Sequence, residues 1–209
     1  MPELAEVETT KRDLKKIISN KKINRTEVYL DKLVYNRKKE FILMTQNQII
    51  YDVKRRGKWL LFELEKSYIV IHFRMEGRFY LLPLNSKRDK HDYVIFYFDD
   101  YELHFNDPRL FGKMEVVLKE DIDKFFNSKK LGLEYTDPKL TVNYLKEKFK
   151  THHTDIKKML LDHSYITGIC NIYADEILFR SKINPKCYAN ELSYEKLGKI
   201  IENTKIVFE

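Results

Sequence analysis

The stretches KWLLFELE (residues 58–65) and YIVIHFRM (residues 68–75) decide the fold of the N-terminal half. Both are rich in β-branched and aromatic residues, and a short polar break separates them, so they predict two neighbouring strands. DYVIFYFDD (92–100) has the same character. Weaker strand patterns lie near 23–30, 49–56, 77–83 and 101–117. Together these segments predict a two-sheet β-sandwich or a flattened barrel.

Helical patterns flank the predicted strands on both sides. Leu4, Val7, Leu14 and Ile18 recur at helical spacing and predict a leading helix over residues 3–18, packed against the sandwich. After residue 118, helical spacing returns in 119–132, 137–150 and 154–163, and SYITGICN (164–171) interrupts it before another helix and a last one near 192–206. We therefore expect an α+β chain with a β-sandwich domain at 1–118 and an all-helical domain at 119–209.

The charge balance suggests a polyanionic partner. The chain has 209 residues and a formal net charge of +7, and a basic protein of this kind often binds nucleic acid. The alternative is a generally lysine-rich composition. Cys170 and Cys187 form no CxxC pair, so the sequence predicts no zinc site. No apolar run approaches ~20 residues and no secretion signal is evident, so we expect an intracellular protein without a membrane span.

The N-terminus, MPELAEVETT, contains a candidate nucleophile. Removal of Met1 would free the secondary amine of Pro2, and an α-amino group has an ordinary pKa of about 7.7–8.0, so part of it is neutral near pH 7. Such an amine can attack carbon and form a cationic Schiff base, with Glu3 as a general acid or base. Taken alone, however, this peptide fits better as an acidic first turn of a helix.

Three loops combine basic and apolar residues. KRRGKWLLF (54–62) places four cations around Gly57 in a predicted hairpin turn that could reach a phosphate. HFRMEGRFY (72–80) puts Met75 at a turn tip, and FNDPRLFGK (105–113) puts Arg109 and Phe111 after a turn. Apolar side chains beside cations suit wedges inserted between bases. The alternative for the basic turn is a solvated surface loop.

TDIKKMLLDHSYITGICNIYADEILF (154–179) predicts a helix, tight turns and a second helix. Asn171 stands at the start of the second helix, where unpaired backbone N–H groups and the positive end of the helix dipole can bind a phosphate. Lys157 lies in the preceding helix.

These motifs, taken in order, resemble the formamidopyrimidine-DNA glycosylase and endonuclease VIII family of bifunctional DNA repair enzymes. MPELAEVET is similar to the family's N-terminal signature, and RRGKWLLF, HFRMEG, NDPRLFG and the 156–179 segment resemble its later motifs. The last corresponds to the helix–two-turn–helix DNA-binding element. The resemblance runs from Met1 to about Pro185.

The resemblance implies a role for each matching residue. Pro2 would be the nucleophile on the deoxyribose C1′, Glu3 would protonate the sugar, and Lys58 would contact phosphate and donate a proton in strand cleavage. Glu6 would be an acid near the active site. The implied DNA contacts are the void-filling residues of the formamidopyrimidine branch (Met75, Arg109 and Phe111), a histidine (His91) and phosphate binders (Lys157 and Asn171).

The implied activity is that of a bifunctional DNA glycosylase/AP lyase of base excision repair. It would remove oxidised purines such as 8-oxoguanine and formamidopyrimidines from double-stranded DNA and cleave the strand by β-elimination. We expect a cytoplasmic, nucleoid-associated monomer. The alternatives are a catalytically weak protein that binds damaged or abasic DNA, and an oxidised-pyrimidine glycosylase of the same family.

Four departures from the family pattern bear on these expectations. Ala5 replaces a usual proline, His153 stands where a phosphate-binding lysine is common, and Cys170 replaces a usual glycine, which would be strained if φ were positive there. The family's four-cysteine zinc finger is missing, so we expect no cofactor in this chain. The finger normally supplies a second proton donor, so δ-elimination is in doubt. The ending at KIVFE favours a truncated form over a natural short one.

Overall fold

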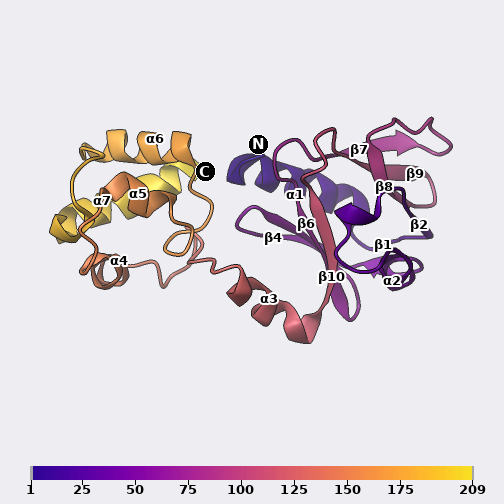
Figure 1. The fold of residues 1–209 in the computed structure, drawn as a ribbon, viewed down its shortest axis with the longest axis horizontal. Coiled ribbons are helices and arrows are strands. Elements are labelled where there is room, and N and C mark those ends of the chain that lie inside the picture. Colours follow the sequence, from indigo (N-terminus) through magenta and orange to yellow (C-terminus); the bar gives the residue numbers. More distant parts are fainter. Residues whose placement is uncertain (1, 209) are drawn as a thin grey trace. The chain divides into compact units, whose positions relative to one another are not determined.

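Two four-stranded antiparallel sheets form the N-terminal part of the computed structural model, which describes residues 2–208 (Figure 1). One sheet has the strand order β10-β6-β5-β4 and the other β2-β8-β9-β7, with a separate β1-β3 pair. The strands are β1 (Lys21–Lys22), β2 (Arg25–Val28), β3 (Ile49–Ile50), β4 (Asp52–Arg56), β5 (Trp59–Glu63), β6 (Ser67–His72), β7 (Arg78–Pro83), β8 (Asp92–Tyr97), β9 (Tyr101–Asn106) and β10 (Lys113–Leu118). The predicted sandwich is confirmed, and the barrel alternative is wrong.

Aromatic side chains join the two sheets. The ring centroid of Phe62 on β5 lies 6.2 Å from that of Phe96 on β8 and 5.6 Å from that of Phe79 on β7. Phe73 stacks on Phe105 of β9 at 6.2 Å. Phe62, Phe96 and Phe105 are fully buried. Such contacts add to the free energy gained by burying large apolar surfaces, so this aromatic cluster holds the inner faces together.

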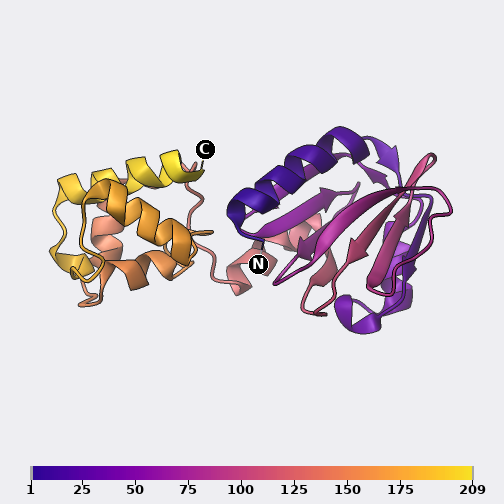
Figure 2. The same ribbon diagram turned by 90° about the horizontal axis from the view of Figure 1, so that it is seen from above.

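Helix α1 (Leu4–Ile18) packs along β4, the edge strand of its sheet (Figure 2). Its buried residues are the four that set the helical spacing in the sequence: Leu4, Val7, Leu14 and Ile18. The predicted leading helix is therefore confirmed, and it covers an edge that would otherwise expose unpaired backbone groups.

The sequence patterns did not indicate helix α2 (Lys38–Thr45). Only Phe41 and Thr45 are buried, one turn apart, so eight residues give too short a repeat to show helical periodicity. The Thr45 hydroxyl lies 2.9 Å from that of Thr26 on β2, which ties the helix to the second sheet.

Contacts divide the chain into two compact units, Met1–Phe125 and Phe126–Glu209, which are described separately. The boundary expected after residue 118 coincides with the end of β10, whereas the first unit continues through most of α3 (Ile122–Ser128). Phe125 packs its ring edge-on against Trp59, with centroids 5.4 Å apart, which explains why this part of α3 belongs to the first unit.

The second unit is helical. It contains α4 (Val142–Phe149), α5 (Ile156–Leu161), α6 (Asn171–Ser181) and α7 (Tyr194–Phe208). α6 packs against α5 and α7, and α4 packs against α7. Its core includes Leu145, Phe149, Ile177 and Ile200, all fully buried. Within residues 2–208 no helix is both long enough and apolar enough to cross a membrane.

Two glycines of the second unit give opposite expectations for substitution by alanine. A Cβ on Gly132 would lie 2.4 Å from the backbone oxygen of Tyr165, whereas a Cβ on Gly198 in α7 would meet Val142 at an ordinary 3.8 Å. We expect Gly132→Ala to lower the free energy of unfolding by about 1–3 kcal/mol through overpacking. Gly198→Ala should raise it by roughly 0.5–1 kcal/mol, since glycine disfavours a helix interior. Calorimetry of both variants checks this, and equal effects would contradict the packing described for residue 132.

Candidate active site

The start of α1 holds two of the predicted acids in fixed positions. Glu3 and Glu6 form a capping box, in which the Glu3 N–H donates to the Glu6 carboxylate at 3.0 Å. This arrangement satisfies backbone N–H groups that a helix start leaves unpaired. Pro2 directly precedes the box and is half-buried. The helix-start interpretation and the nucleophile interpretation of this peptide are therefore compatible, because the cap holds the acids next to Pro2.

Lys58 is a buried cation paired with Glu3. It is 9% exposed, and its Nζ forms an ion pair with Glu3 Oε2. A buried charge is costly unless it is paired, so the two side chains stabilise each other. The pair joins the N-terminus to the turn between β4 and β5, and it places an ammonium and a carboxylate next to Pro2.

A second ion pair, further along α1, fixes this geometry. Arg55 on β4 donates from Nε to Glu8 Oε2 at 2.9 Å and from Nη1 to the carbonyl oxygen of Gly57, also at 2.9 Å. Gly57 has φ 57°, a conformation that glycine adopts without strain. One guanidinium thus holds both the helix and the turn that precedes Lys58. No local pattern of residues indicates this contact, because 47 positions separate its partners.

Pro2 and Glu6 line a cavity of about 400 Å³. Its other walls come from α1 and from the loop that joins β6 to β7: Thr10, Phe73, Met75, Glu76, Gly77 and Arg78. A Cβ on Gly77 would lie 2.7 Å from the backbone oxygen of Phe73, so this wall requires glycine. The candidate nucleophile Pro2 and Met75 therefore line the same cavity.

The three predicted void-filling residues lie close to one another. Arg109 Cζ lies 5.3 Å from the ring centroid of Phe111, and Arg109 Nη1 lies 3.8 Å from Glu76 Oε1, next to Met75. Met75 and Phe111 also line a second hollow of about 430 Å³ with Tyr35, Arg74 and Lys113. All three predicted residues are exposed, so a cation and two apolar side chains project from adjacent loops.

Buried Asp107 shapes the loop that carries Arg109 and Phe111. Its carboxylate accepts hydrogen bonds from the N–H groups of Gly112 at 2.6 Å and Arg109 at 3.2 Å. Leu110 has φ 60°, and Arg74, next to Met75, has φ 57°. Positive φ is unfavourable for such residues. Surrounding contacts therefore hold both loops in strained conformations.

His91 is anchored to the same loop by its backbone. Its carbonyl oxygen accepts from the Asp107 N–H at 3.0 Å, and its ring Nδ1 lies 3.4 Å from the Tyr93 hydroxyl. The first unit therefore contains eight of the predicted site residues: Pro2, Glu3, Glu6, Lys58, Met75, His91, Arg109 and Phe111.

Sequence reasoning did not select His72, which lies beside this site. On β6 it lies opposite Trp59, the residue of β5 that directly follows Lys58. The His72 ring packs edge-on against the Trp59 ring, with centroids 4.6 Å apart. Its Nδ1 accepts the Arg74 N–H at 3.0 Å, so it also supports the turn that carries Met75. Its position at the end of a strand, before a polar turn, was the available signal.

The second unit contains the three remaining predicted residues. Lys157 on α5 forms an ion pair with Asp175 on α6 at 2.7 Å, and Asn171 is the first residue of α6. The His153 ring stacks on Tyr188 with centroids 3.6 Å apart. Cys170 is extended, with φ −103° and ψ 179°, and Gly168 instead has the positive φ of this turn. The strain considered for Cys170 therefore does not arise.

Among residues 2–208, no group of three or more His, Cys, Asp or Glu side chains is arranged to hold a metal ion. Cys170 and Cys187 are both free thiols. The two cysteines of the chain cannot supply the four thiolates of the family's zinc finger.

Comparison with protein-family models defines the class of protein to which the chain belongs. The model of the formamidopyrimidine-DNA glycosylase N-terminal domain matches residues 1–114, and that of the formamidopyrimidine-DNA glycosylase H2TH domain matches residues 131–209. A β-sandwich followed by a helix–two-turn–helix domain is thus the architecture of a DNA repair glycosylase.

Individual relatives identify the family. Formamidopyrimidine-DNA glycosylase from Listeria innocua is 40% identical over 99% of this chain and 77% of its own length, and that from Carboxydothermus hydrogenoformans is 42% identical over 97% and 74%. A solved complex of Lactococcus lactis Fpg with abasic-site DNA superimposes with a TM-score of 0.92 at 32% identity, covering 98% of this chain and 76% of that one. The chain belongs to the formamidopyrimidine-DNA glycosylase family.

The Glu8–Arg55 ion pair predicts a pH-dependent contribution to stability. Burial raises the pKa of Glu8, but hydrogen bonds from Lys11 and Arg55 outweigh it and hold that pKa below its ordinary value of 4.5. The folded pKa lies below the unfolded one, so the contribution is complete above about pH 4.5 and is lost as the pH falls through the folded value. Glu8→Gln should lower the free energy of unfolding at pH 7 by about 1–3 kcal/mol, with the difference shrinking in acid.

Urea unfolding, followed by the fluorescence of Trp59, measures the first unit, because Trp59 is the only tryptophan in the chain. Asp31→Asn is the matched control in the same unit: it neutralises an exposed aspartate paired with Lys38, for which only a small effect is expected. A pH-independent difference between Glu8→Gln and the parent protein would contradict the assigned role of Glu8.

Proposed function

We propose that this chain is a bifunctional DNA glycosylase and AP lyase that removes oxidised purines from double-stranded DNA and cleaves the strand by β-elimination. The observation that carries the proposal is the ion pair between Glu3 and the buried Lys58, directly beside Pro2, which lines a cavity. A base and an acid next to an N-terminal amine are the groups that such a reaction needs.

The first chemical step replaces the bond to the damaged base. After removal of Met1, the Pro2 nitrogen donates its lone pair to C1′ of the deoxyribose while the C1′–base bond breaks and its electron pair leaves with the base. The proton of the attacking amine passes to the Glu3 carboxylate, which delivers it to the sugar ring oxygen O4′, and the departed base takes a proton from water. The C1′–O4′ bond then opens, and a cationic iminium joins Pro2 to C1′. An iminium of this kind withdraws electrons from the neighbouring carbon.

Strand cleavage follows from that electron withdrawal. Loss of a proton from C2′ sends its electron pair toward the iminium and expels the 3′ phosphate, which completes β-elimination. Lys58, which is paired with Glu3, would contact a phosphate and donate a proton in this step. Hydrolysis of the remaining iminium by water releases Pro2 for another turnover.

A base inside a duplex is inaccessible to Pro2, so it must be flipped out and the gap filled. Met75, Arg109 and Phe111 project together from adjacent loops and suit this role. Intercalated apolar side chains offset part of the lost stacking. The arginine adds hydrogen-bond donors for the base left opposite the gap.

Contacts with DNA phosphates would hold the distorted duplex, and each unit contains residues suited to make them. His91 is anchored beside the void-filling loop in the first unit. In the second, Lys157 lies on α5, His153 precedes it, and Asn171 begins α6, whose N-cap residue makes no side-chain capping bond. A helix start of this kind favours an anionic ligand.

Borohydride trapping tests the nucleophile. We expect the Met1-processed protein to form a covalent adduct with duplex DNA that carries an abasic site, because borohydride reduces the iminium to a stable amine. Mass spectrometry of the digested adduct should place the DNA on Pro2. Glu3→Gln should slow excision of 8-oxoguanine by about 10²-fold or more, the usual contribution of a general acid, while binding to abasic DNA changes little.

Controls separate catalysis from binding. Intact-mass measurement must first show that Met1 is absent, since the nitrogen of Pro2 is otherwise an amide. A duplex with an oxidised pyrimidine tests lesion range, because a solved structure shows Lactococcus lactis Fpg bound to such DNA. Tight binding without any adduct would support the alternative of a damage-binding protein, and an adduct on a lysine would exclude Pro2.

Met75→Ala tests the void-filling role. We expect it to slow excision of 8-oxoguanine from a duplex by roughly tenfold. Unstacking a base costs a few kcal/mol, and alanine would replace less of the lost stacking than the methionine side chain does. Cleavage at an abasic site, where no base needs to be displaced, should change less. Leu84→Ala is the matched control, because Leu84 is 42% exposed and Met75 38%, and Leu84 lies outside the site. Equal losses on both substrates would contradict a role in base displacement.

A further inference from the structure

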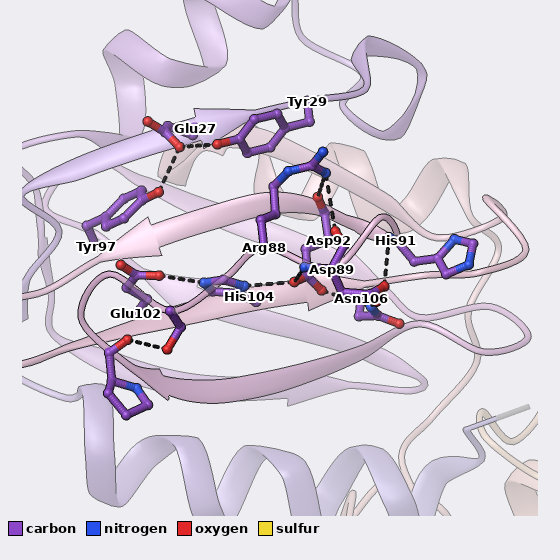
Figure 3. Close-up of polar contacts among 12 residues, drawn as sticks. Glu27, Tyr29, Arg88, Asp89, His91, Asp92, Tyr97, Glu102, His104 and Asn106 are labelled. Atoms are coloured by element: carbon purple, nitrogen blue, oxygen red, sulfur yellow. Dashed lines mark hydrogen bonds and ion pairs between the residues drawn. The ribbon is translucent and has the colours of Figure 1, made fainter.

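A fully buried histidine on β9 lies between two carboxylates. His104 Nδ1 is 2.9 Å from Asp92 Oδ2, and its Nε2 is 2.7 Å from Glu102 Oε2 (Figure 3). The histidine is 0% exposed, Asp92 2% and Glu102 3%. None of the three is needed for the chemistry described above, yet burying three ionisable groups together is costly unless they compensate one another.

With Asp92 and Glu102 both ionised, the geometry of the two contacts indicates how many protons the ring carries. An ionised carboxylate only accepts hydrogen bonds, and a neutral imidazole has a single N–H to donate. Two short contacts to two carboxylates are therefore satisfied together when both ring nitrogens carry protons. The imidazolium then compensates one of the two negative charges, and backbone and amide N–H groups bind the remaining lone pairs.

Those N–H groups come largely from one segment, residues 85–92. The N–H of Asn85 donates to Glu102 Oε1 at 2.8 Å, and that of Asp89 donates to Asp92 Oδ2 at 2.9 Å. The two carboxylates that hold His104 thus also hold the beginning and the middle of the loop between β7 and β8.

The same network reaches His91. Asn106 Nδ2 donates to Asp92 Oδ1 at 2.8 Å and to Asp89 Oδ1 at 3.3 Å, and Asp89 Oδ1 also accepts the N–H of His91 at 2.9 Å. Arg88 Nη1 donates to the backbone oxygen of Asp92 at 3.0 Å. Figure 3 shows the chain of contacts running from His104 through Asp92 and Asn106 to the loop beside His91.

We propose that His104 is a positioning residue: a buried imidazolium, clamped between Asp92 and Glu102, fixes residues 85–92 so that His91 is held ready for a DNA phosphate. The role of His91 rests on the proposed function, whereas the clamp itself does not. His104 acts through this segment and does not touch the substrate.

The clamp is tested without DNA. Nitrogen-15 NMR of the histidine rings in the full chain should show protons on both nitrogens of His104 in neutral buffer. In His104→Gln, amide hydrogen exchange of residues 85–92 should accelerate by about tenfold or more, because opening free energies control exchange. Thr45→Val, which removes a different buried polar contact in the same unit, is the matched control and should leave that segment unchanged.

A double-mutant cycle tests the connection to His91. We expect His91→Ala and His104→Gln each to weaken binding of an abasic-site duplex by roughly fivefold to tenfold at fixed salt, about the size of one ordinary hydrogen bond. The double variant should be no weaker than either single one, because both act through one contact.

The outcomes separate the two proposals. A His104 ring with one unprotonated nitrogen, or unchanged exchange in residues 85–92, overturns the clamp. Additive losses in the cycle overturn its action through His91. If His91→Ala binds as tightly as the parent chain while exchange in His104→Gln accelerates, the DNA-contact role of His91 fails and the clamp stands.

Discussion

The ion pair between Glu8 and Arg55 is the contact on which the candidate active site depends. Arg55 binds the helix through Glu8 and the turn through the Gly57 carbonyl, so a single guanidinium sets the distance between two segments far apart in the sequence. The Glu3–Lys58 pair can form only when α1 lies along β4 in this register. The burial of Lys58 against Glu3 and the α1 wall of the cavity follow from that docking, whereas the capping box is local to the start of α1.

Local patterns in the sequence predicted most of the fold. The period-two strands, the leading helix and the helical second half appear where their residues indicated, because each pattern needs only a few neighbouring positions. Helix α2 was missed since two buried residues in eight show no clear period. Whether the strands closed into a barrel or formed two sheets depends on long-range pairing, which these patterns do not encode.

The residues of the candidate site also fall into those that local sequence indicated and those that it did not. Pro2, Lys58, Met75 and the 105–113 loop stood out because the residues are unusual for their local setting. His72, Asp107 and His104 did not, since each acquires its role from partners on other strands or loops. The concern about Cys170 was wrong because a backbone angle at one position depends on the whole turn, and Gly168 has the positive φ there. The assigned roles of the site residues remain proposals.

The positive φ angles of Arg74 and Leu110 bear on how this protein could be made more heat-stable. Each adjoins a residue for which a void-filling role is proposed, and glycine at either position would relieve backbone strain in the folded state. The relaxed loops would also sample more conformations, so Met75 and Phe111 would enter a duplex with a larger loss of entropy. Selection for thermal tolerance alone would therefore favour glycine at these positions, whereas selection that also preserves activity would favour changes elsewhere in the sandwich. The two strained positions thus mark where stability and activity oppose each other.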